Sequence, residues 1–325
     1  MNNVPLYKVT LGKHGLISYQ ADPNEEYRWM LHESFEWFSK AKEKYGPTWK
    51  YYDNDTVDPV TYKFDSLGFR SDREITDLPD EWILCSTECV GVGPGLHSRD
   101  LFQNILEERT GIPFYNASTY GGRLEAIPFN FLQLSKLWRT PPKHILLAGS
   151  QNSTGVSVGV PGVPVNIKNI DYIPAAIRAR HTSGDEKDLL FLYQSMGIAK
   201  WHHMLMMKTI IRLAEHWNIP VTWINGTSDT LEDMSKESSS NLVDDELHII
   251  HHFMAGIGIT LTGDPETDLN TMSDMILKPM EDKIPPPGAT VEQVSRDLLH
   301  PGASVHLALA DKVEFELDAF GTLNS

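Results

Sequence analysis

The sequence predicts an α/β fold built on a parallel β-sheet with helices on both faces. From Trp82 onward, short apolar runs alternate with segments of helical periodicity. Such alternation requires right-handed crossover connections, which place helices on both faces of a parallel sheet. The first apolar run, residues 82–84, ends abruptly in small and polar residues followed by glycines, as expected for a buried strand that leads into a turn. The 325 residues suffice for one large domain with additions.

Residues 1–75 are predicted to form an N-terminal extension that packs on the main domain, residues 76–325. One helix is expected at 23–45, followed by a turn-rich connection at 51–59 and by a short strand with a glycine turn within 61–74. The apolar residues that recur at helical steps, and that would form the buried side of this helix, are Tyr27, Leu31, Phe35, Phe38, Ala41 and Tyr45.

The main domain is expected to alternate strands and helices, with insertions at about 150–190 and 228–285. The second insertion contains an apolar helix near 244–257. The chain closes with a loop that runs into a last helix after His300. Strands are predicted at 82–87, 112–118, 144–149 and 219–225, and helices at 98–110 (ended by Gly111), at 122–138 (broken or shifted near Pro128) and at 186–217.

The charge balance and the cysteine content exclude several classes of protein. There are 44 acidic and 28 basic residues, a net charge of −16, whereas nucleic acids and anionic membranes are held by clusters of Lys and Arg. The first twenty residues lack the layout of a signal peptide, and no apolar run is long enough for a membrane span. We therefore expect a location in the cytoplasm or in a particle. Cys85 and Cys89 form neither a disulfide scaffold nor a zinc motif, so two buried thiols are expected.

Asp297 and His300 are the pair with the clearest chemical meaning. The acid precedes the histidine by three residues, and Pro301 and Gly302 follow, so both belong to a tight loop in which the carboxylate can orient the imidazole. A general base in a catalytic triad needs such an acceptor and a hydroxyl on its other side. Thr87 or Ser86, at the end of the first strand, would supply it. Alternatively, Asp297 caps the last helix and His300 packs beneath it.

Several segments together resemble the SGNH (GDSL-type) hydrolase family. They run in the family's order, cover residues 61–152 and 290–317, and include F-D-S-L-G-F-R-S-D-R-E, C-S-T-E-C-V-G-V-G, N-A-S-T-Y-G-G, L-A-G-S-Q-N and D-L-L-H-P-G. The resemblance implies a three-layer α/β/α, flavodoxin-like fold. It also implies an esterase, lipase or carbohydrate O-deacetylase that needs no metal or other cofactor.

Laid on the family's first block, this chain has Thr87 at the nucleophile position and Ser86 at the position of the aspartate. A shift of one residue would instead offer Ser86 as the nucleophile. Gly121 falls where the second block donates a backbone N–H to the oxyanion. In the third block Gln151 occupies the asparagine position, and Asn152 follows it. The resemblance thus implies Gly121 with Gln151 or Asn152 as the oxyanion hole.

Three other patterns carry chemistry of their own. His248, His251 and His252 have spacings that a metal could use, but no carboxylate motif accompanies them, and a packed or solvated helix is the simpler interpretation. Cys85 or Cys89 paired with His300 would make a cysteine hydrolase. The glycines of G-V-G-P-G, residues 91–95, lack the Gly-Lys-Ser/Thr ending of a phosphate-binding loop.

Two functions remain open at this point. The first is an ester hydrolase, acting on a small ester or on an O-acetyl group of a glycan, without cofactor or metal. The second is a catalytically inactive relative of the same scaffold that binds a glycan or a protein partner, for example as a structural component of a phage particle. The second interpretation is motivated by the substitutions in the first and third blocks.

Overall fold

The computed structural model describes residues 9–19, 21–23, 25–30, 33–87, 89–119, 126–148, 198–224, 241–242, 291, 293–298 and 300–323. Before Trp82 the elements are β1 (Val9–Leu11), η1 (Lys13–Gly15), β2 (Ile17–Tyr19), β3 (Glu26–Tyr27), α1 (Phe35–Tyr45), η2 (Gly46–Thr48), β4 (Tyr62–Lys63) and η3 (Ile75–Asp77). After it come β5 (Ile83–Ser86), α2 (Cys89–Val92), η4 (Ser98–Asp100), α3 (Phe102–Thr110), β6 (Phe114–Asn116), α4 (Ala126–Leu134), β7 (His144–Ala148), α7 (Ile198–His216), β8 (Val221–Ile224), β9 (Asn241–Leu242) and α11 (Ala303–Ala319).

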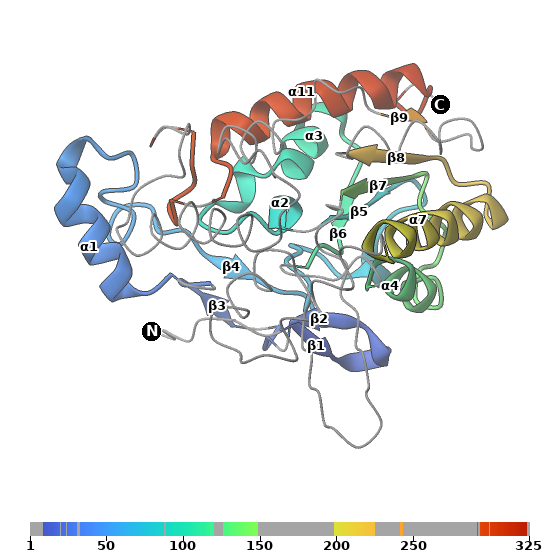
Figure 1. Cartoon of the computed structure of the whole chain (residues 1–325), viewed down its shortest axis with the longest axis horizontal. Helices are drawn as coiled ribbons and strands as arrows, with labels where there is room; N and C mark the ends of the chain where they lie inside the picture. Colours follow the sequence, from blue (N-terminus) through green and yellow to red (C-terminus); the bar gives the residue numbers. More distant parts are fainter. Residues whose placement is uncertain are drawn as a thin grey trace.

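The centre of the fold is a parallel sheet of order β6-β5-β7-β8, extended by the two-residue strand β9 (Figure 1). In the register of the central strands, Leu84 on β5 is opposite Tyr115 on β6 and Ile145 on β7. The predicted α/β fold with a parallel sheet is therefore confirmed. Among the described strands of this sheet β9 was not predicted, and neither were β1, β2 and β3 outside it. β5 is the first strand of this sheet in the chain. The next strand, β6, lies on one side of it, and the strands after that lie on the other side. Ligands of open parallel sheets bind at the point where the strand order reverses in this way.

Helices pack on both faces of this sheet (Figure 1). On one face, Ile83, Cys85 and Leu146 pack with apolar side chains of α3 and α11. On the other face, Leu84 and Leu147 pack with side chains of α4 and α7. Successive residues of a buried parallel strand point to opposite faces, which is why the apolar runs of these strands are nearly continuous rather than alternating. The two clusters are the core that positions the strand ends.

The N-terminal helix begins later than predicted, and the prediction was wrong for the described residues before Phe35. Helix α1 begins at Phe35 because Ser34 is its N-cap and accepts a hydrogen bond from the backbone N–H of Trp37. Tyr27, assigned to the helix by periodicity, lies on β3, which pairs with β4. Phe35 was expected on the buried side but is 56% exposed.

The N-terminal segment is held to the sheet domain by hydrogen bonds that span long stretches of the chain. Asn130 on α4 accepts a bond from the backbone N–H of Ile17 and donates one to the Ile17 carbonyl. Aromatic residues around α1, including Trp29, Phe38 and Trp49, form a buried cluster that also contains Leu298 from the loop before α11. The segment thus contacts both α4 and that loop.

The remaining predictions for helices fall partly outside the described residues. Helix α3 ends at Gly111, whose left-handed backbone has a φ of 71°. Pro128 lies within the first turn of α4 as described, where the missing N–H costs no intrahelical bond. Residues 186–197, the apolar segment at 244–257 and most of the two predicted insertions lie outside the described residues. Among the residues that are described, no helix is long and apolar enough to cross a membrane.

Candidate active site

Ser86 and Thr87 lie at the carboxyl end of β5, and both are buried. Because side chains alternate along a strand, Thr87 points to the same face as Cys85, and Ser86 to the face of Leu84. Cys85 belongs to the cluster with α3 and α11. Helix α11 directly follows His300 in the chain. Thr87, rather than Ser86, therefore shares a face of the sheet with the helix that carries the histidine loop.

The hydroxyl of Thr87 is paired with that of Ser118, which follows β6. The two oxygens are 2.9 Å apart, and the backbone N–H of Thr87 also donates to Ser118 Oγ over 3.0 Å. Neither side chain is exposed beyond 2%. Ser118 was not among the predicted site residues, although it lies in the N-A-S-T segment, directly after a strand that neighbours β5. Neighbouring parallel strands end at the same edge of a sheet, so residues that follow two such strands lie near each other. The position of Ser118 just after a predicted strand was therefore the feature of the sequence that could have indicated it.

Cys85 is not poised to act as a nucleophile. Burial raises the pKa of its thiol to about 12, although hydrogen bonds with Ser118 and Thr87 act in the opposite direction. A thiol reacts as its thiolate, so Cys85 is unreactive near neutral pH. This speaks against a cysteine hydrolase built on Cys85. The side chain of Cys89 lies outside the described residues.

Asp297 and His300 contact each other through two hydrogen bonds. His300 Nδ1 lies 2.5 Å from Asp297 Oδ2, and the backbone N–H of His300 donates to Asp297 Oδ1 over 3.0 Å. Ser295 Oγ donates to the same Oδ1 over 2.6 Å. When Nδ1–H donates to the carboxylate, the lone pair of the neutral imidazole is on Nε2, the atom that a general base uses. The N-cap of α11 is Gly302, so Asp297 does not cap that helix.

The loop that carries this pair is closed by backbone hydrogen bonds. The N–H of Ser295 donates to the carbonyl of His300, and the N–H of Gly302 donates to that of Gln293. Leu298, between the two site residues, has a φ of 60°, which is a costly conformation for a branched side chain. Such strained residues concentrate at functional sites, where the surrounding contacts hold them in place.

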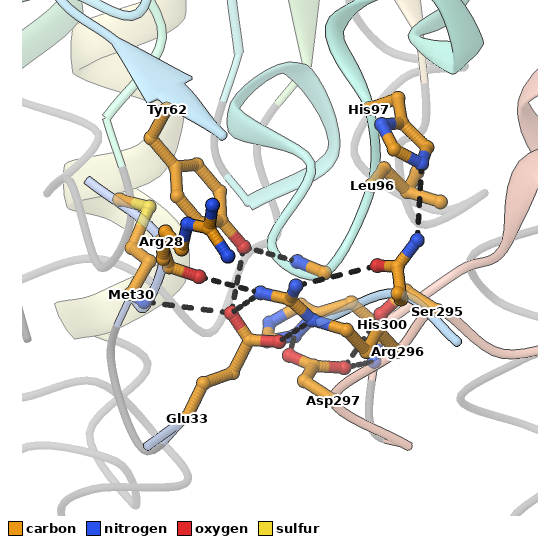
Figure 2. A network of polar contacts seen from close by, with 12 residues as sticks. Arg28, Met30, Glu33, Tyr62, Leu96, His97, Ser295, Arg296, Asp297 and His300 are labelled. Carbon is orange, nitrogen blue, oxygen red and sulfur yellow. Dashed lines mark hydrogen bonds and ion pairs between the residues drawn. The ribbon is translucent and has the colours of Figure 1, made fainter. Parts of the chain in front are cut away.

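The residue beside Asp297 anchors this loop to the N-terminal segment (Figure 2). Arg296 Nε lies 2.8 Å from Glu33 Oε1, and Arg296 Nη2 lies 3.0 Å from Glu33 Oε2, with both side chains at most 1% exposed. Burial is the largest single effect on the pKa of Arg296 and lowers it, but Glu33, Tyr62 and Asp297 together raise the pKa above its usual range. Arg296 Nη2 also donates to the carbonyl of Arg28, and the guanidinium lies over the ring of Trp29.

Tyr62 links the same ion pair to the glycine segment that follows Thr87. Its hydroxyl donates to Glu33 Oε2 over 2.7 Å (Figure 2). It accepts from the backbone N–H of Gly95, also over 2.7 Å. Burial and the adjacent carboxylate of Glu33 raise the pKa of Tyr62 well above its usual value, so the phenol stays protonated. The contacts therefore join the N-terminal segment, the glycine segment and the Asp297 loop.

The segment G-V-G-P-G connects the two halves of the site. A Cβ at Gly91 would lie 2.1 Å from both Thr87 Oγ1 and Ser118 Oγ, and a Cβ at Gly95 would lie 2.8 Å from the backbone nitrogen of Asp297. Gly95 also has a φ of 74°, in the left-handed region. Glycine is thus required at these positions by close packing, and the segment lies between the hydroxyl pair and the histidine loop.

The F-D-S-L-G-F-R motif also holds this glycine segment. Arg70 donates to the carbonyls of Val92, Gly93 and Leu96 over 2.6–2.7 Å. Asp65 shapes the turn that presents Arg70, since its Oδ1 accepts from the backbone of Phe69. Burial raises the pKa of Asp65 to about 6. The motif is therefore a structural support for the segment after Thr87.

The predicted oxyanion-hole residues Gly121, Gln151 and Asn152 lie outside the described residues, and so does the histidine group His248, His251 and His252. Across the part of the chain that the structure describes, no group of three His, Cys, Asp or Glu side chains is placed to hold a metal ion. The described candidate residues thus form two groups, the hydroxyls of Thr87 and Ser118 and the Asp297–His300 pair, and the glycine segment packs against the first group at Gly91 and against the loop of the second at Gly95.

Comparison with known proteins gives no further guide to the function. No model of a known protein family matches the sequence. No curated protein matches it either. The function has to be argued from the chemistry of the site.

Proposed function

We propose that this protein is an SGNH-like ester hydrolase with a three-layer α/β/α, flavodoxin-like fold. The single observation that carries the proposal is the Asp297–His300 contact of 2.5 Å on a closed loop that is anchored by a buried ion pair. The strand order β6-β5-β7-β8-β9, which in chain order is 2-1-3-4-5, supports the fold. Thr87 follows β5, where this order reverses.

In the proposed reaction Thr87 Oγ1 attacks the acyl carbon of an ester while its proton passes to His300 Nε2. Asp297 holds the imidazole by its Nδ1–H and stabilises the imidazolium that forms. His300 then returns the proton to the alcohol as it leaves, which produces an acyl-enzyme on Thr87. A water, deprotonated by His300, hydrolyses this intermediate to a carboxylic acid and restores Thr87.

The oxyanion of each tetrahedral intermediate needs donors, and Gly121 with Gln151 or Asn152 is proposed for this role. The substrate class that we propose is a small ester or an O-acetylated glycan, with no cofactor. The net charge of −16 suits a neutral substrate better than an anionic one, because like charges repel. Thr87 is preferred to Ser86 because its side chain points to the face of the sheet that α11 covers.

The test is hydrolysis of p-nitrophenyl acetate and of acetylated xylo-oligosaccharides by the purified protein and its variants. His300→Ala should lower kcat/KM about 10²- to 10⁴-fold, the usual contribution of a general base. Thr87→Ala should abolish turnover, and Ser86→Ala should retain it. Unchanged turnover in His300→Ala would exclude the assignment.

A second function is favoured by one observation, the burial of Thr87. Its side chain is 2% exposed, and its hydroxyl is bonded to Ser118. A nucleophile must reach its substrate, so this arrangement also suits an inactive scaffold that serves as a binding or structural module, for example in a phage particle. Folded protein that hydrolyses none of the esters but binds an acetylated glycan or a protein partner would favour this alternative.

A further inference from the structure

Ser118 contacts the proposed nucleophile at two atoms. Its Oγ accepts the backbone N–H of Thr87 and lies 2.9 Å from Thr87 Oγ1. The Ser118 side chain is fully buried, and its own backbone N–H donates to Asn116 Oδ1 over 3.1 Å. Asn116 is fixed in turn, since its Nδ2 donates to the carbonyls of Gly91 and Arg70. Ser118 is therefore held in one place relative to Thr87.

The direction of the hydroxyl–hydroxyl bond follows from counting protons. A serine hydroxyl has one proton to donate and two lone pairs with which to accept. At Ser118 one lone pair is occupied by the N–H of Thr87. The proton is left for Thr87 Oγ1, because the sulfur of Cys85, the other neighbour, is only a weak acceptor. If Thr87 gives its own proton to His300, it cannot also donate to Ser118. During the proposed attack the bond must therefore run from Ser118 Oγ–H to Thr87 Oγ1.

We propose that Ser118 is a positioning residue for the nucleophile: it donates to Thr87 Oγ1 and so fixes the side-chain rotamer and stabilises the oxygen as it loses its proton. This inference rests on the proposed hydrolase function. A hydrogen bond to an oxygen that gains negative charge becomes shorter and stronger, so it favours the transition state over the ground state. Fixing the rotamer matters more for threonine than for serine, because only one χ1 rotamer of the branched side chain directs its oxygen rather than its methyl group toward the ester.

The structure also explains why this support has to come from Ser118. Thr87 Oγ1 lies against Gly91, where a Cβ would be 2.1 Å away, so no side chain at position 91 could donate to it. The Cys85 thiol also lies beside the pair, but a thiol is a weak donor. The hydroxyl of Ser118 is the strong donor among these three neighbours.

The experiment compares wild type, Ser118→Ala and Ser118→Cys by steady-state hydrolysis of p-nitrophenyl acetate. Ser118→Ala should lower kcat about 10²-fold with KM nearly unchanged, similar to the loss of one oxyanion donor. Ser118→Cys keeps the volume and a weak donor, so its kcat should lie between those of the wild type and Ser118→Ala. This variant also provides a test if the alanine variant does not fold. Ser135→Ala is the control, because Ser135 follows α4 and donates to the carbonyl of Leu132.

Labelling with a fluorophosphonate, located by mass spectrometry, separates this inference from the function on which it depends. We expect the label on Thr87 in the wild type and a slower rate of labelling in Ser118→Ala. A label on Ser118 would overturn the inference, because Ser118 would then be the nucleophile. Wild-type kcat in a folded Ser118→Ala would overturn it while leaving the hydrolase intact. Neither label nor hydrolysis in the wild type would refute the hydrolase, and the role of Ser118 with it.

Discussion

The buried ion pair between Glu33 and Arg296 allows the sharpest prediction about stability. Glu33→Gln replaces the carboxylate by a neutral amide of the same shape, so that Arg296, 1% exposed, loses the carboxylate with which it forms its ion pair. Breaking a buried pair on one side typically costs about 3 to 5 kcal/mol. The carbonyl of Arg28 and the ring of Trp29 still contact the guanidinium, so we expect the lower end, about 3 kcal/mol. That is a large part of the free energy of unfolding of an ordinary domain, about 5 to 15 kcal/mol.

The assay is urea unfolding at pH 7.5, followed by tryptophan fluorescence and circular dichroism. Arg296→Met removes the other partner, and the double variant removes both charges at once. The double variant leaves neither charge of the pair behind. Its loss of unfolding free energy should therefore be smaller than the sum of the losses in the two single variants, by about 1 to 3 kcal/mol. Glu36→Gln is the matched control. Its pair with Lys40 lies on the surface of α1, with side chains 79% and 60% exposed, so it should cost less than about 1 kcal/mol.

Two results would refute the reasoning. A loss below about 1 kcal/mol in Glu33→Gln would mean that the pair behaves like a surface salt bridge. Strictly additive losses in the double variant would mean that the two charges do not stabilise each other. In either case the N-terminal segment would not anchor the loop of Asp297 through this pair.

Two further predictions concern acid stability and packing. Burial lowers the pKa of His144 to about 4, so between pH 6.5 and 4 the unfolded chain binds a proton that the folded chain excludes, and stability falls as the pH falls. Between pH 7.5 and 4.5 the free energy of unfolding of His144→Gln, measured by urea titration, should therefore fall by about 2 to 3 kcal/mol less than that of the wild type. An equal fall in both proteins would contradict this. Gly91→Ala should abolish hydrolysis and cost about 1 to 3 kcal/mol, because its Cβ would overlap two buried hydroxyls. Gly111→Ala is the control: its Cβ would have no atom within 4 Å, but its φ is 71°, so it should lower the free energy of unfolding by about 1 kcal/mol and leave activity unchanged. Wild-type activity in Gly91→Ala would contradict the prediction, because it would show that the two hydroxyls can shift without consequence.

Local patterns predicted the strands and helices of the sheet domain well, because each depends on residues that are close in sequence. The run before Ser86 is uniformly apolar and marked a strand buried on both faces, and Gly111 marked a helix end. The same approach failed at residues 23–34. There Tyr27 is in helical step with the apolar residues that follow it, yet it pairs with Tyr62 in a small sheet, and Ser34 starts the helix instead.

In the candidate site, the sequence predicted which residues approach each other only where they are neighbours in the chain. Asp297 and His300 are three residues apart, and the carboxylate and the imidazole are in contact as their spacing suggested. Ser118 is 31 residues from Thr87, and nothing local indicated that their hydroxyls meet. Glu33 is 263 residues from Arg296, and neither residue belongs to a motif that would pair them.

What the sequence determined by itself is therefore the parallel α/β architecture and the D-x-x-H loop, since both follow from periodicity and short-range spacing. What only the tertiary structure decided is which hydroxyl accompanies Thr87 and what holds Arg296. The physical reason is that a buried polar group must find a partner wherever the fold brings one within reach, and that distance in space is set by how β5, β6 and the N-terminal segment pack. The face of β5 that α11 covers likewise comes from packing, and it is the reason why we propose Thr87 rather than Ser86 as the nucleophile.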